Sequence, residues 1–94
     1  GIRALKIKVQ AVTGATTLTD AQSGSYIYCT GSGVPTLPAS AESGQQYTII
    51  NNTGGNLSVG LNSNSIIPSG HADMANQTAR TYVAIASGTW YSIG

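Results

Sequence analysis

Apolar and polar residues alternate with a period of two along most of this chain of 94 residues. The first clear instance places Leu5, Ile7 and Val9 in alternation with Lys6, Lys8 and Gln10. A period of two is typical of a β-strand that buries one face, so this segment is predicted to be a strand or an extended arm with one apolar and one basic face. We assign residues 1–15 to this N-terminal strand or arm and residues 16–94 to a single β domain.

Further segments with strand character follow at intervals of about ten residues. They are residues 26–30, 36–37, 45–50, 57–61, 66–67, 80–86 and 90–93. Evenly spaced short strands predict an all-β fold, and we expect a small antiparallel β-sandwich or barrel-like domain rather than a parallel sheet. Thr53–Asn56 (TGGN) predicts a tight hairpin turn. Its likeness to Gly31–Val34 (GSGV) is attributed to turn chemistry and not to an internal repeat.

The segment Arg80–Ala86 has apolar residues on both of its predicted faces. Tyr82 and Ala84 lie on one face, and Val83 and Ile85 lie on the other. A strand without a clearly polar face suits a central core position or a subunit interface. Tyr82, Val83 and Ile85 are therefore the candidates for contacts between subunits.

The composition of the chain indicates that it assembles into an oligomer. Charged residues make up only 7 % of the chain and the formal net charge is +1, while hydrophobic residues make up 40 %. A single domain of this size has a thin core, and Cys29, the one cysteine, cannot form a disulfide within the chain. We therefore expect oligomerisation to add stability. The charge is too small for nucleic-acid binding, and no apolar run approaches the ~20 residues that span a bilayer.

The residues that carry chemistry are few and scattered. The acids Asp20, Glu42 and Asp73 fall in three different predicted turns, which argues against a paired-carboxylate site. Cys29 and His71 could form a nucleophile pair, but a lone cysteine in a strand is more typical of a core. His71 and Asp73 form only an isolated H-x-D, a weak metal signal. We expect neither an enzyme nor a bound cofactor or metal.

Aromatic residues near the C-terminus are compatible with the binding of a sugar. Trp90 and Tyr91 offer ring faces on which a sugar could stack, although aromatic residues in strands are more often core or interface anchors. A glycan contact at Trp90 and Tyr91 is kept as an alternative.

Four segments carry a resemblance to a known group. They are TLTDAQSG (Thr17–Gly24), TLPAS (Thr36–Ser40), SGQQYTIINNTGGNLSV (Ser43–Val59) and GTWYSIG (Gly88–Gly94). In this order they resemble a small β module of tailed-bacteriophage virion proteins, found in head decoration proteins and in tail-fibre segments. The resemblance extends over residues 16–94. One departure is the insertion of Ala21 and Gln22 between Asp20 and Ser23, where the group has a tighter Asp-Ser-Gly.

The resemblance implies a non-enzymatic structural protein of the phage particle, commonly trimeric. The basic start and the tryptophan strand at the end favour a complete capsid decoration protein located on the head surface. Its partner would be the major capsid protein, contacted by Arg3, Leu5, Lys6, Ile7 and Lys8. The alternative is a tail-fibre or receptor-binding module that contacts a host-surface glycan.

Overall fold

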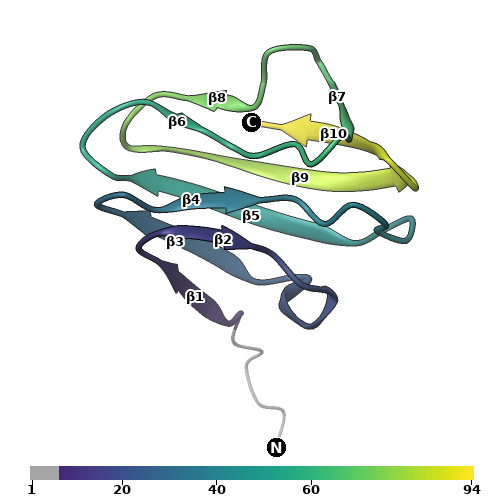
Figure 1. Ribbon diagram of the computed structural model, residues 1–94, viewed down its shortest axis with the longest axis horizontal. Coiled ribbons are helices and arrows are strands. Elements are labelled where there is room, and N and C mark those ends of the chain that lie inside the picture. The colour runs from purple at the N-terminus through teal and green to yellow at the C-terminus, as the bar shows by residue number, and fades with distance from the viewer. Residues whose placement is uncertain (1–6) are drawn as a thin grey trace, which may run out of the picture.

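The computed structural model describes residues 7–94, which form ten strands and one short 3-10 helix (Figure 1). The elements in chain order are β1 (Val9–Val12), β2 (Ala15–Thr17), η1 (Asp20–Gln22), β3 (Tyr26–Thr30), β4 (Val34–Thr36), β5 (Gln46–Asn52), β6 (Leu57–Ser58), β7 (Ser65–Ile67), β8 (Asp73–Met74), β9 (Thr78–Ala86) and β10 (Thr89–Ile93).

The first three turns of the chain stack on one another. Strands β1, β3 and β5 pair in parallel within a six-stranded sheet whose order is β1-β3-β5-β9-β10-β7. On the second wall β2 pairs in parallel with β4, and a parallel bridge joins Thr36 to Gly60. In Figure 1 β1, β3, β5 and β9 lie one above another, with β2 and β4 in a second layer. The architecture is a β-solenoid of about four turns with mostly parallel bridges.

The expectation of an antiparallel sandwich or barrel was therefore wrong, although the all-β class holds. The turn at Thr53–Asn56 shows why. It does not join a hairpin, because β5 pairs with β3 and β9, while β6 crosses to the other side and pairs with β8. Alternation shows which residues of a strand are buried, but it does not show which strand lies alongside or in which direction.

Residues at equivalent positions of successive turns form columns in the core. The register places Val12 beside Cys29 and Cys29 beside Asn51, and all three are buried. The prediction that Ile27 and Cys29 share one face of their strand is confirmed, since both are fully buried. The largest buried side chains of the remaining core are Leu18, Leu37, Tyr47, Ile49, Met74, Tyr82 and Trp90.

Antiparallel strands close the C-terminal end of the solenoid. β9 pairs antiparallel with β5, and β8 pairs antiparallel with β6, so the third turn is covered on both walls. The guanidinium of Arg80 and the hydroxyl of Tyr82 each donate a hydrogen bond of 2.6 Å to the carbonyl oxygen of His71, which holds the loop before β8 against β9.

Asn51 is the buried polar residue that ties this closing end together. Its Nδ2 donates to the carbonyl oxygens of Gly55 at 2.9 Å and of Met74 and Ala75 at 3.0 Å. Its Oδ1 accepts the backbone N–H of Thr53 at 3.1 Å. The side chain thus satisfies the corner after β5 and the segment after β8 at once, which is what a buried amide needs to be stable.

We predict that Asn51→Ala lowers the free energy of unfolding by about 3 kcal/mol, because three carbonyl oxygens and the partly buried N–H of Thr53 lose their partner together. The exposed neighbour Asn52 is the control, and Asn52→Ala is expected to cost less than about 1 kcal/mol. Chemical denaturation of the two variants measures both values. Equal, small losses would contradict the bridging role of Asn51.

Close stacking of the first two turns gives a second prediction. A Cβ added at Gly33 would overlap the carbonyl oxygen of Val12 on the preceding turn, whereas one added at Gly55 meets nothing within 4 Å. Backbone cannot yield as a side chain does, so Gly33→Ala is expected to cost about 2 kcal/mol or more and Gly55→Ala very little. Thermal or denaturant unfolding of the two variants measures the loss of stability in each. If the two variants were equally stable, the turns would not stack this closely.

Candidate functional site

The structure places only part of the predicted N-terminal contact segment. Arg3, Leu5 and Lys6 lie outside the described residues. Ile7 and Lys8 are exposed, and the carbonyl oxygen of Lys8 accepts the N–H of Tyr26 at 2.9 Å. Lys8 therefore continues the pairing of β1 along β3. Within residues 7–94, β1 pairs with β3 alone, so it forms one edge of the six-stranded sheet.

The two aromatic residues considered for a glycan lie on opposite sides of β10. Trp90 is fully buried, and its ring centroid lies 5.8 Å from that of Tyr47 at an interplanar angle of 34°. It has no exposed ring face for a sugar. Tyr91 points outward and keeps 44 % of its surface exposed.

The three residues predicted for subunit contacts also divide between the two faces of their strand. Tyr82 is fully buried, and burial is the main cause that raises the pKa of its hydroxyl. Its side chain anchors the loop at His71 and is not on the surface. Val83 is half-buried and Ile85 is half-exposed, and both point away from the core. Only Val83 and Ile85 are placed to touch another molecule.

The outward side of the six-stranded sheet is the most distinctive surface, and we call it the outer face. Its members point away from the core in register across all six strands. They are Val9, Ala11, Tyr26, Tyr28, Thr30, Gln46, Thr48, Ile50, Asn52, Ser65, Ile67, Ala79, Thr81, Val83, Ile85, Thr89, Tyr91 and Ile93. Every one of these described residues is uncharged, and most are apolar.

Polar groups on the outer face bond to one another. The hydroxyls of Thr48 and Thr81, paired across β5 and β9, lie 2.9 Å apart. The Nδ2 of Asn52 donates to the hydroxyl of Tyr28 at 2.8 Å. Groups that already have partners cost less to remove from water, so the face is suited to being covered.

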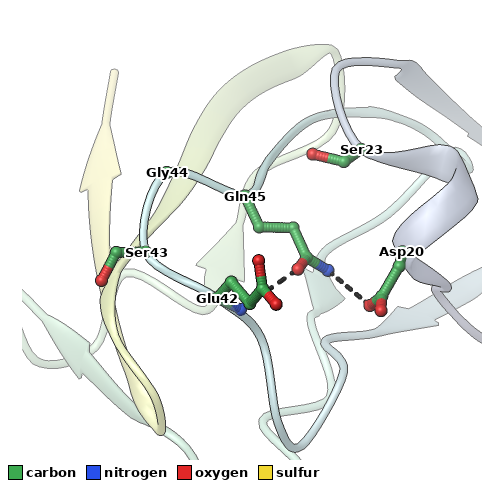
Figure 2. Close-up of a pocket in the computed structure, with 6 residues that line it drawn as sticks. All are labelled: Asp20, Ser23, Glu42, Ser43, Gly44 and Gln45. Atoms are coloured by element: carbon green, nitrogen blue, oxygen red, sulfur yellow. Dashed lines mark hydrogen bonds between the residues drawn. The ribbon is translucent and has the colours of Figure 1, made fainter.

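A polar hollow of about 350 Å³ lies between η1 and the turn before β5 (Figure 2). It is lined by Asp20, Ser23, Glu42, Ser43, Gly44 and Gln45. The Nε2 of Gln45 donates to Oδ1 of Asp20 at 2.9 Å, and its Oε1 accepts the N–H of Glu42 at 3.2 Å. Sequence reasoning separated these two acids, but stacking of successive turns brings them to one hollow. Asp73 lies elsewhere and accepts a 2.6 Å hydrogen bond from Ser58.

Cys29 and His71, the candidate nucleophile pair, lie in different surroundings. Cys29 is fully buried, and burial raises the pKa of its thiol to about 11, so it stays protonated. The ring of His71 lies 3.3 Å from the hydroxyl of Ser92, and among the described residues no hydrogen bond links it to Cys29. Nor do residues 7–94 gather three or more histidine, cysteine, aspartate or glutamate side chains in a group able to hold a metal.

Comparison with protein-family models, with curated proteins and with solved structures finds no match to this chain. No helix in the described part of the chain is long and apolar enough to cross a membrane. The case for a function therefore depends on the surfaces described above and on the sequence resemblance.

The state of Cys29 gives a prediction about alkaline pH. Because the folded pKa of about 11 lies above the ordinary 9.0, burial of the neutral thiol stabilises the fold below pH 9 and this stabilisation is lost as pH rises toward 11. Burial also raises the pKa of Tyr47 and Tyr82, which act in the same direction. Between about pH 8 and about pH 10.5, we expect denaturant unfolding to show a smaller loss of stability for Cys29→Ala than for the wild type. Equal losses would contradict this role of Cys29.

Proposed function

We propose that this chain is a non-enzymatic structural protein of a tailed-bacteriophage virion, a decoration protein that assembles as a homotrimer on the capsid surface and stabilises the shell. The observation that carries the proposal is the uncharged, largely apolar outer face. An exposed apolar patch of this kind is typical of a surface that other protein covers. The resemblance to phage virion modules supplies the setting.

The segments that carry the resemblance lie in the framework of the solenoid. The N–H of Leu18 donates to the carbonyl oxygen of Thr36 at 2.8 Å, and the N–H of Leu37 donates to that of Gly60 at 2.9 Å. The Thr-Leu pairs of the resemblance thus occupy equivalent positions on stacked turns. They build a stiff scaffold, and the outer face and the β1 edge are left for contacts.

The β1 edge and the basic residues before it are the proposed capsid contact. A sheet edge presents backbone N–H and C=O groups that can pair with an extended segment of a partner. Ile7 and Lys8 adjoin this edge, and Arg3, Leu5 and Lys6 precede them in the sequence. Positive residues beside a pairing edge favour an acidic segment of the major capsid protein, since complementary charges speed and orient association.

The tail-fibre or receptor-binding alternative now depends on Tyr91, since Trp90 is buried. Of the two residues considered for a glycan, only Tyr91 exposes its ring, so that pair gives a sugar a single stacking surface. We therefore place the capsid function first.

Charge reversal tests the capsid contact. We expect Lys6→Glu combined with Lys8→Glu to weaken binding to heads stripped of this protein by at least about tenfold. Ser69→Glu, in the exposed turn between β7 and β8, adds an acid at the edge of the sheet opposite β1 and is expected to bind as the wild type does. Co-sedimentation with stripped heads measures binding, and circular dichroism checks folding.

Two results would contradict these proposals. If the wild type failed to bind stripped heads, the decoration function would be wrong. If the wild type bound and the double reversal bound equally well, the decoration function would stand and the contact would lie elsewhere. A variant lacking residues 1–7 provides a second test and is expected to lose binding, because the deletion removes most of the contact segment and stops before β1, so that the ten strands of the described residues stay intact.

A further inference from the structure

We infer that the outer face is a self-association surface and that its occupant is a second copy of this chain. The inference rests on the self-assembly part of the proposed function and identifies the surface responsible for it. It does not depend on capsid binding.

The exposed apolar side chains of the outer face are contiguous. Val9 retains 60 % of its surface exposed, Ile93 57 % and Ile85 50 %. One row of paired apolar and aromatic residues crosses four strands through Ala11, Tyr28, Ile50 and Ala79. Paired positions on one face of a sheet touch one another, so these side chains form one surface. Scattered exposed apolar residues are normal, but a continuous patch indicates an interaction site.

The outward residues also depart from the usual pattern for a solvent-facing sheet. An antiparallel sheet with one wet face alternates apolar residues inward with polar residues outward. In β9 the inward residues Tyr82 and Ala84 are buried, yet the outward residues Val83 and Ile85 are also apolar. This strand is built to be covered on both sides.

Charge identifies the occupant. The described outer face carries no acidic or basic side chain, whereas tyrosine and isoleucine are prominent on it. Depletion of charge and enrichment of aromatic residues mark the centre of a protein interface. A partner with charged residues would leave them buried without a counter-charge, which is costly. A second copy presents the same uncharged surface, so no charge is left unpaired.

The size of the outer face suits a stable interface. The strands of the sheet differ in length, and at ~3.3 Å per residue and ~4.8 Å between strands their residues give a flat projection of about 520 Å². Burial of this area on both partners would remove about 1,000 Å² from water in total, which reaches the lower bound for a specific interface. In the proposed homotrimer, three copies would turn their outer faces toward a common axis, so that each face meets parts of the other two.

Sedimentation of the full chain tests the inference directly. At protein concentrations up to about 100 µM, the wild type is expected to sediment as an oligomer. Tyr91→Lys combined with Ile93→Lys is expected to weaken self-association at least about 100-fold, because two charges would be buried without partners. The control is Val34→Lys, which changes an exposed apolar strand residue on the other wall, in β4, and is expected to leave the oligomer intact.

Thiol labelling provides a second measurement that adds no charge. Cys29 is buried and therefore silent in the folded protein, so a single introduced cysteine reports its own exposure. Ile93→Cys is expected to label at least about fivefold more slowly at about 100 µM than at about 1 µM. Val34→Cys is expected to label at one rate throughout.

Two outcomes overturn the inference. A wild type that remains monomeric up to about 100 µM would mean that another kind of partner covers the face. An oligomer unaffected by the double lysine variant, with no protection at Ile93→Cys, would place self-association on another surface. If self-association held and stripped heads were not bound, the decoration function would fail and the inference would stand.

Discussion

The whole structure depends on each turn of backbone stacking directly on the turn before it. The β1, β3 and β5 ladders can form only if successive turns return to the same place, so each residue of the core meets its equivalent one turn later. Val12, Cys29 and Asn51 occupy one such column. The approach is so close that Gly33 leaves no space for a Cβ beside the carbonyl oxygen of Val12. Stacking therefore decides which small residues are required, and where.

The column also explains how the solenoid stops. In its first two members the interior residue is apolar, but the third is Asn51, whose amide binds backbone of the closing segment. A polar residue at this height has partners only because β8 and β9 turn back antiparallel and bring their backbone within reach. Burial of one amide and reversal of strand direction thus occur together at this end, while β1 and β7 remain the two edges of the six-stranded sheet.

The sequence predicted the positions of strands well but their pairing poorly. Alternation of apolar and polar residues shows which face of a strand is buried, but not which strand lies beside it. It correctly separated the two faces of residues 26–30, but the same alternation would occur in a sandwich. The overlooked signal was a repeat of about 20 residues. Its marks are Thr-Gly at 13–14, 30–31 and 53–54, followed by Thr-Leu at 17–18 and 36–37 and Gly-Leu at 60–61. Asp20 and Glu42 line one hollow because they occupy equivalent places in successive repeats, and the residues around each of them in the sequence do not indicate this. Alternation within residues 80–86 was enough to predict that Ile85 points outward. The burial of Trp90 could not be predicted in this way, because it depends on pairing with the buried Ala84 of β9.

The two candidate contacts lie in perpendicular directions and use different physics. The β1 edge points along the solenoid axis and offers backbone hydrogen bonds, which any extended segment can accept. The outer face points sideways and offers side-chain burial, which demands a matching surface. The proposed function requires two contacts that do not compete, one with the shell and one between copies of the chain. Because the outer face consists of side chains and the β1 edge of backbone groups, self-association through the outer face leaves the β1 edge free, and attachment at that edge leaves the outer face free.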